Sequence, residues 1–212
     1  MSEKGSNKVE QATEEKKNLT FTDQMRVRFR GVLDPIGAFL NRIGLMPNTM
    51  TILGLIGNTV GAFLLSQGQF TYGGLIILAM GPVDALDGTM ARLRGEPSEF
   101  GAFVDSVTDR YSELVIFGGL LVFYVQDADW VMALVTYFAA SGSVMVSYIR
   151  ARASSLGYDT KVGILTRMER YLVLAPTLVL GYPWVGLWII AILANITALQ
   201  RIWDIRVQTQ GK

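Results

Sequence analysis

Residues 71–125 read TYGGLIILAMGPVDALDGTMARLRGEPSEFGAFVDSVTDRYSELVIFGGLLVFYV, and they constrain the architecture more than any other part of the chain. They form two mainly apolar segments, 71–94 and 99–125, joined by a short polar hairpin. Each segment is long enough for the roughly 20 residues that a membrane-spanning helix needs. Each also carries two aspartates, although one aspartate at the centre of a spanning helix costs about 2.5–3.5 kcal/mol on insertion scales. Such residues need partners and mark a functional site.

The four aspartates are spaced to converge. Asp84 and Asp87 are three residues apart, and Asp105 and Asp109 are four apart. Each pair therefore shares one face of its helix. A short hairpin packs the two helices antiparallel, so that the pairs can meet near one membrane face. Four neighbouring carboxylates cannot all stay ionised without compensation, and divalent cations that prefer oxygen ligands supply it. The sequence therefore predicts a Mg²⁺ or Mn²⁺ site.

The rest of the chain predicts an all-α integral membrane protein. Six transmembrane helices are expected at 49–67, 71–94, 99–125, 130–154, 167–182 and 184–205, within a membrane domain of residues 46–206. Residues 21–45 place apolar side chains at roughly helical spacing with arginines between them, which indicates an amphipathic interfacial helix kinked near Pro35. An ordinary surface helix is the alternative. Residues 1–20 are expected to be a disordered polar tail, and 207–212 a short C-terminal tail.

The composition excludes some catalytic groups, and the distribution of charge predicts the orientation of the chain in the membrane. The chain has 19 Lys+Arg, 18 Asp+Glu, no cysteine and no histidine. It therefore has no thiolate nucleophile or imidazole base, and it lacks the basic excess of a nucleic-acid binder. The basic residues of the spans fall at the ends on the side of the N-terminal tail, whereas the opposite junctions carry only Asp127 and Asp129. By the positive-inside rule, both termini and the aspartates face the cytoplasm of a multi-pass cell-membrane protein.

Small residues flank the aspartates at fixed distances. The whole array is Asp84-x2-Asp87-Gly88-x2-Ala91-Arg92-x8-Gly101-x3-Asp105-x3-Asp109. A single glycine here is explained by close packing of membrane helices, but the whole array is not. It resembles, at every fixed position, the signature of the CDP-alcohol phosphotransferases, integral membrane enzymes of phospholipid synthesis. The resemblance extends over the six spans, the preceding helix and the Pro47-Asn48-x-x-Thr51 entry to the first span.

The resemblance implies a function and roles for individual residues. Asp84, Asp87 and Asp105 would hold two divalent ions, Mg²⁺ or Mn²⁺, and Asp109 would complete the site and act as general base. The donor would be a CDP-linked lipid, either CDP-diacylglycerol or its archaeal ether counterpart. The residues implied to bind it are Asn48, Thr51, Gly88, Ala91, Arg92 and Gly101. The family resemblance also favours a homodimer, and membrane lipids are expected to surround the protein.

The acceptor is suggested by three short stretches. They are Ser147-Tyr148-Ile149-Arg150-Ala151-Arg152-Ala153, Glu169-Arg170 and Gln200-Arg201. They resemble the subgroup that transfers to inositol 1-phosphate, the phosphatidylinositol-phosphate synthases and their archaeal counterparts. The implied acceptor-phosphate residues are Ser147, Arg150, Arg170 and Arg201, from helix ends that could surround one cavity. Bacterial members often have Lys where Arg150 stands and Pro where Met168 stands.

Other interpretations stay open on the sequence alone. The same arginines could be membrane anchors that meet lipid headgroups. Glycerol 3-phosphate or another alcohol could replace inositol phosphate as the small polyol-phosphate acceptor. A divalent-cation transporter is the alternative from another class. It is disfavoured because the aspartates lie near one membrane face, whereas transporter sites lie at the midplane.

Overall fold

The computed structural model describes residues 21–95, 98–160 and 162–210, and these residues fold into α-helices and connecting turns. The helices are α2 (Phe21–Arg42), α3 (Pro47–Ser66), α4 (Phe70–Arg94), α5 (Glu99–Gln126), α6 (Trp130–Ser155), α7 (Arg167–Val179) and α8 (Pro183–Gln210). Each expected segment from 21 onward corresponds to one helix. The last helix continues to Gln210, beyond the boundary expected at 206. The expected tail at 1–20 lies outside the described residues.

Local sequence signals explain where the site-bearing helices begin and end. Gly95 takes a left-handed conformation (φ 69°) and ends α4, a conformation that a residue without Cβ adopts at no steric cost. Ser98 then caps α5, because its hydroxyl accepts a hydrogen bond from the backbone N–H of Gly101 at 2.9 Å. Asp129 caps α6 in the same way through Met132. Gly95 therefore ends α4 and Ser98 begins α5, which defines the short connection between the two helices.

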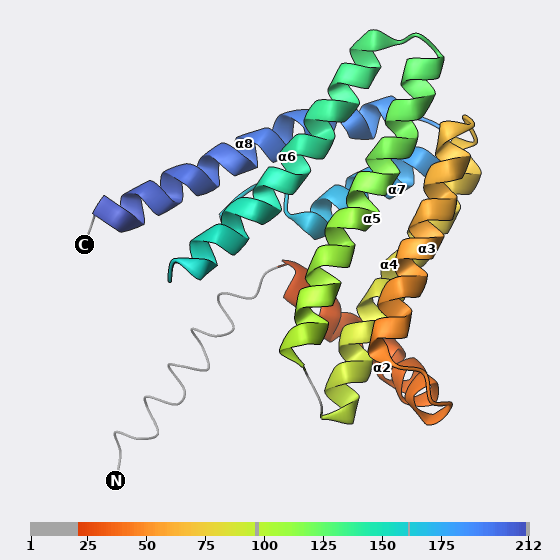
Figure 1. Cartoon of the computed structure of the whole chain (residues 1–212), viewed down its shortest axis with the longest axis vertical. Helices are drawn as coiled ribbons and strands as arrows, with labels where there is room; N and C mark the ends of the chain where they lie inside the picture. Colours follow the sequence, from red (N-terminus) through yellow and green to blue (C-terminus); the bar gives the residue numbers. More distant parts are fainter. Residues whose placement is uncertain (1–20, 96–97, 161, 211–212) are drawn as a thin grey trace.

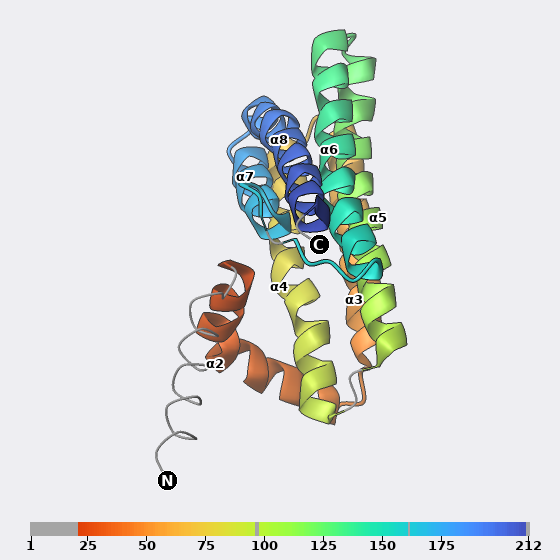
Figure 2. The ribbon, with the colours of Figure 1, turned by 90° about the vertical axis from the view of Figure 1, so that its left-hand side faces the viewer.

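The helices form a bundle in which α3 packs against both α4 and α5 (Figure 1). Helix α5 also contacts α6, and α6 packs along α8. Helix α7 lies between α4 and α8 and contacts both (Figure 2). The main apolar core draws on α3 to α8 and includes Leu65, Leu120, Leu178 and Ile190, all fully buried. This arrangement brings α7, a segment distant in sequence, next to α4.

Among the described residues, four helices are long and apolar enough to cross a membrane: α3, α4, α6 and α8. Helix α5 is long enough, at 28 residues, but its first half carries the two aspartates and further charges. Helix α7 has only 13 residues. At 1.5 Å per residue it extends about 20 Å, less than the roughly 30 Å of a hydrocarbon core. It begins at Arg167 as expected but ends before the expected residue 182, because the chain turns at Gly181 (φ 79°).

The outer surface of the bundle suits a lipid environment. Large apolar side chains on several helices point outward, among them Phe63 (64% exposed), Trp130 (68%) and Leu199 (66%). Soluble monomers rarely expose so many in contiguous patches. The fold is therefore that of an all-helical membrane protein with several spans.

Helix α2 lies at the end of the bundle that holds the α4–α5 hairpin, where it packs against α4 (Figure 2). It stays helical through Pro35 and changes direction along its length. Phe29, Val32, Ile36 and Phe39 on this helix are exposed. Arg28 and Arg30 are exposed as well, so the amphipathic character and the interfacial position of α2 both stay predictions.

Candidate active site

The four aspartates come from two helices, α4 and α5, that both pack against α3. Asp84 and Asp87 come from α4, and Asp105 and Asp109 from α5. Asp105 lies close enough to each of the other three for their charges to interact. Asp87 is buried and the other three are half-buried. The direct packing of α4 on α5 that the hairpin predicted is wrong, because both helices pack against α3 instead, and the roles of the four aspartates stay predictions.

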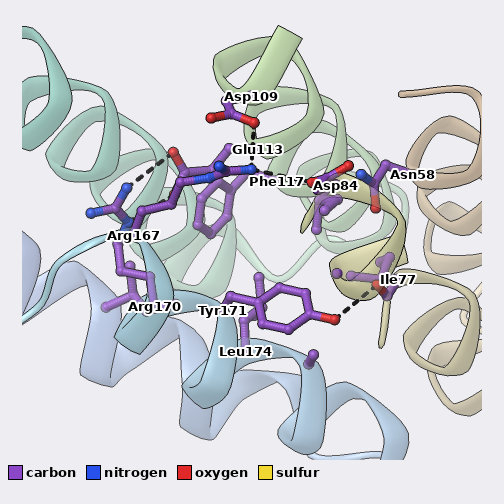
Figure 3. Close-up of a pocket in the computed structure, with 14 residues that line it drawn as sticks. Asn58, Ile77, Asp84, Asp109, Glu113, Phe117, Arg167, Arg170, Tyr171 and Leu174 are labelled. Carbon is purple, nitrogen blue, oxygen red and sulfur yellow. Dashed lines mark hydrogen bonds and ion pairs between the residues drawn. The ribbon is translucent and has the colours of Figure 1, made fainter. Parts of the chain in front are cut away.

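A cation from a third helix lies among these carboxylates. Arg167, the first residue of α7, places Nη2 at 2.5 Å from Asp109 Oδ1 and 3.2 Å from Asp84 Oδ2 (Figure 3). Arg110 approaches the other oxygen of Asp109 at 3.6 Å. Within the described residues, no three carboxylates are arranged closely enough to share one ion. The guanidinium of Arg167 is thus the cation that Asp84 and Asp109 share here.

Asp87 is held in place by helix α3. Thr51 Oγ1 donates a buried hydrogen bond of 2.7 Å to Asp87 Oδ2, and the backbone N–H of Gly88 donates to Oδ1 at 2.5 Å. Helix α3 also approaches α4 at Gly54, where an added Cβ would collide with the carboxylate of Asp84. Close packing of α3 therefore sets the positions of both α4 carboxylates.

A buried ion pair forms the wall of the site beyond Asp109. Arg170 is only 2% exposed, and its Nε and Nη2 donate to the two oxygens of Glu113 at 2.7 and 3.2 Å. Its Nη1 donates to the carbonyl of Leu165 at 3.3 Å. Fork-to-fork pairing of this kind is among the strongest side-chain interactions. Sequence reasoning selected Arg170 but missed Glu113, a charged residue one helical turn after Asp109 in an otherwise apolar run.

Arg201 on α8 is buried and hydrogen-bonded to the protein, as Arg170 is. It is 2% exposed, and it donates from Nε to the carbonyl of Val162 at 3.0 Å and from Nη1 to that of Val146 at 2.7 Å. Arg150 and Arg170 lie near enough to Arg201 for their charges to interact. Arg150 is exposed and Ser147 is half-buried on α6. Of these four residues Arg170 alone lines the pocket between α4, α5 and α7, so a shared phosphate cavity stays a prediction.

The residues implied for CDP-lipid binding lie towards the hairpin end of α3, α4 and α5. Gly88, Arg92 and Asn48 are exposed, and Ala91 and Gly101 are half-buried. Asn48 approaches Gly101, since a Cβ built there would lie 3.8 Å from Asn48 Oδ1. Arg92 pairs with Asp34 of α2 at 2.9 Å, an interaction that the sequence did not indicate. Asn48 of α3 and Gly101 of α5 are therefore neighbours, and CDP-lipid binding by this set stays a prediction.

A pocket opens between α4, α5 and α7 (Figure 3). Its lining contains the polar residues Asn58, Asp84, Asp109, Glu113, Arg167 and Arg170, with Tyr171 and apolar side chains deeper in the bundle. The carboxylates fit hard divalent cations, because Mg²⁺ and Mn²⁺ prefer oxygen ligands. The position between Asp84 and Asp109 already holds a positive group, the guanidinium of Arg167. The donor set therefore suits divalent metal ions.

Comparison with known proteins finds relatives that synthesise inositol phospholipid phosphates. The chain is 35% identical over 196 residues to phosphatidylinositol phosphate synthase of Streptomyces avermitilis, covering 85% of this chain and 80% of the relative. It is 35% identical over 184 residues to archaetidylinositol phosphate synthase of Pyrococcus horikoshii, covering 85% and 94%.

Solved structures agree. The crystal structure of Mycobacterium tuberculosis phosphatidylinositol phosphate synthase with CDP-DAG bound matches with a TM-score of 0.74 and 32% identity, covering 81% of this chain and 92% of that one. A second structure of that protein, in complex with manganese and citrate, matches with the same TM-score and covers 87% of that chain.

The family assignment rests on the greater part of the chain. Residues 44–200 match the CDP-alcohol phosphatidyltransferase family, a range that holds all four converging aspartates and five of the helices that surround them. With the fold, the aspartate array and the relatives in agreement, this chain belongs to the CDP-alcohol phosphatidyltransferase family of membrane-embedded transferases.

Proposed function

We propose that this protein transfers the phosphatidyl-type group of a CDP-linked lipid to a hydroxyl of inositol 1-phosphate and releases CMP. The observation that carries the proposal is the gathering of four signature aspartates from α4 and α5 beside a cluster of arginines. Its support is the similarity to synthases of phosphatidylinositol phosphate and archaetidylinositol phosphate. The donor is CDP-diacylglycerol or its archaeal ether counterpart.

Two divalent ions, Mg²⁺ or Mn²⁺, would be held by Asp84, Asp87, Asp105 and Asp109. Support comes from the carboxylate oxygens themselves and from the guanidinium of Arg167, which marks the position as one that attracts positive charge. When bound, such ions neutralise a pyrophosphate and stabilise the departing nucleotide. Thr51 would keep Asp87 aimed at the site through its 2.7 Å hydrogen bond.

Asp109 is proposed to be the general base. It would take the proton of the acceptor hydroxyl, whose oxygen then forms a bond to the β-phosphorus while the bond from that phosphorus to CMP breaks. The chain offers no cysteine or histidine to carry a covalent intermediate. Direct in-line transfer is therefore the simplest course of the reaction.

The donor would occupy the hairpin end of the bundle. Gly88, Ala91 and Gly101 have little or no side chain, so a bulky ligand can approach the backbone of α4 and α5. Asn48 and Thr51 would contact it from α3. Arg92 would meet an anionic group, and in doing so would exchange its 2.9 Å ion pair with Asp34 for the ligand.

The acceptor phosphate would be attracted by Arg150, Arg170 and Arg201, with Ser147 beside them. The charges of the three arginines reach one another, and guanidinium groups suit phosphate oxygens. Arg170 and Arg201 already donate to protein acceptors. They would therefore act largely through their fixed positive charge, while the exposed Arg150 has freedom to contact the phosphate directly.

The proposed setting is the cell membrane. Both termini and the active site would face the cytoplasm, because the basic residues of the spans lie at that end and acceptor phosphates are water-soluble. The N-terminal helix α2 would lie in the membrane interface with Phe29, Val32 and Phe39 towards the acyl chains. We further propose that the protein works as a homodimer.

Mass spectrometry of the lipid product tests the acceptor. Purified protein would be given CDP-diacylglycerol and Mn²⁺ with inositol 1-phosphate, glycerol 3-phosphate or unphosphorylated inositol in separate reactions. We expect the inositol phosphate product alone to form at a substantial rate. A product formed only with glycerol 3-phosphate would overturn the choice of acceptor.

A further inference from the structure

Helix α4 contains a proline at a sensitive place. Pro82 lies inside the helix, two residues before Asp84. Since proline has no N–H, the carbonyl of Leu78 four residues earlier lacks its usual helical donor. Inside a membrane protein such a carbonyl is satisfied by a neighbouring helix, a side chain or an ordered water. Helix α4 nevertheless continues to Arg94.

The missing donor is supplied by Tyr171 of α7. Its hydroxyl lies 2.7 Å from the carbonyl oxygen of Leu78. It also lies 3.2 Å from the carbonyl oxygen of Ile77, the contact drawn in Figure 3. A hydroxyl has one proton to donate, and the shorter distance assigns it to Leu78. The tyrosine thus bonds to the carbonyl that Pro82 leaves without its helical partner.

The packing around this hydroxyl depends on Gly81. A Cβ built on Gly81 would collide with the hydroxyl and ring of Tyr171. Gly81 and Pro82 are therefore adjacent residues with complementary effects: one makes room for the hydroxyl and the other creates its acceptor. The two residues lie immediately before the segment that carries Asp84.

The same face of α7 holds α4 at a second point. Arg167 precedes Tyr171 by four residues, so the two side chains project from one face of α7. Arg167 reaches Asp84 at 3.2 Å, and Tyr171 reaches α4 on the other side of Pro82. The two contacts therefore bracket the proline.

We propose that Tyr171 is a positioning residue, which fixes the path of α4 at Pro82 and so sets the place of Asp84 relative to Asp109. The inference rests on the proposed function only in taking Asp84 as a metal ligand. The hydroxyl itself touches no reacting group.

A double-mutant cycle tests this role. Tyr171→Phe removes only the hydroxyl, whereas Pro82→Ala restores the N–H that can donate to Leu78. In detergent-purified protein we expect Tyr171→Phe to weaken Mn²⁺ binding, measured by isothermal titration calorimetry, by about tenfold. In the Pro82→Ala background the same substitution is expected to change Mn²⁺ affinity less than about twofold, because the carbonyl then has its helical donor. Tyr72→Phe, on an exposed residue of α4, is the matched control and should bind Mn²⁺ normally.

The outcomes separate positioning from simple packing. Unchanged Mn²⁺ affinity in Tyr171→Phe would overturn the proposal, and so would an equal loss in both backgrounds, since ring packing alone would cause that. If Pro82→Ala does not fold, Gly81→Ala is tested in its place. Its Cβ would displace the hydroxyl of Tyr171, so this variant should bind Mn²⁺ as weakly as Tyr171→Phe does. Normal Mn²⁺ binding by Gly81→Ala would refute the positioning role. Because calorimetry needs no turnover, a protein that binds Mn²⁺ in this pattern but releases no CMP would refute the proposed function alone.

Discussion

The ion pair between Arg170 and Glu113 gives the sharpest stability prediction. Arg170 is 2% exposed and Glu113 18% exposed, and two hydrogen bonds of 2.7 and 3.2 Å join them. Glu113→Ala would leave the guanidinium buried with the Leu165 carbonyl as its remaining acceptor among those described. Removing one partner of a buried pair costs on the order of 3–5 kcal/mol, because the other charge stays desolvated.

Thermal unfolding of the detergent-purified protein, followed by tryptophan fluorescence, measures this cost. For a chain of this length each 1 kcal/mol lowers Tm by roughly 2–4 °C, so Glu113→Ala should lower it by about 6–20 °C. Glu99→Ala is the matched control on the same helix. Glu99 is exposed in the first turn, where a carboxylate contributes about 0.3–1 kcal/mol.

A second variant separates stability from function. Replacing both partners, Arg170→Met with Glu113→Leu, should return Tm close to that of the unaltered protein, since no unpaired charge remains. The KM for inositol 1-phosphate should nevertheless rise, because the positive charge near Arg201 is lost. A Glu113→Ala shift no larger than that of Glu99→Ala would refute the reasoning on the pair.

Two further predictions concern α3. Thr51→Val removes the 2.7 Å hydrogen bond to buried Asp87 and should cost about 1.5–3 kcal/mol of stability, measured by thermal unfolding; no change in Tm would contradict the contact. Gly54→Ala should reduce CMP release by about 100-fold, because the new Cβ displaces the carboxylate of Asp84. Gly57→Ala is its control, since the Cβ there meets only a flexible methionine side chain; equal losses in both variants would point to helix packing in general.

The convergence of the aspartates could be predicted because local rules determine it. Spacings of three and four residues place each pair on one helix face, and the short connection starts α5 beside the end of α4. The ends of α4 and α5 follow from Gly95 and Ser98 in the same way. These features need no knowledge of distant contacts.

The contribution of α7 could not be predicted in this way. Arg167 reaches Asp84 from 83 residues away in sequence, and only the packing of α7 against α4 brings them together. For Arg201 the sequence indicated a charge near a cavity, but not that backbone carbonyls of α6 and the following loop would accept its hydrogen bonds. Glu113 did leave a signal in the sequence, because it is a charged residue in an apolar segment one helical turn after Asp109. The rule that ionisable residues inside membrane spans mark functional sites would have identified Glu113.

CMP release from CDP-diacylglycerol is the most direct test of the proposed chemistry. The purified protein would be assayed with inositol 1-phosphate and Mn²⁺, with the metal removed by chelation, and as Asp109→Asn with the metal present. We predict CMP release that requires the metal and the acceptor together, and almost none from Asp109→Asn even though that variant still binds the CDP-lipid. Near-normal CMP release by Asp109→Asn, or by the unaltered protein without metal, would contradict the account.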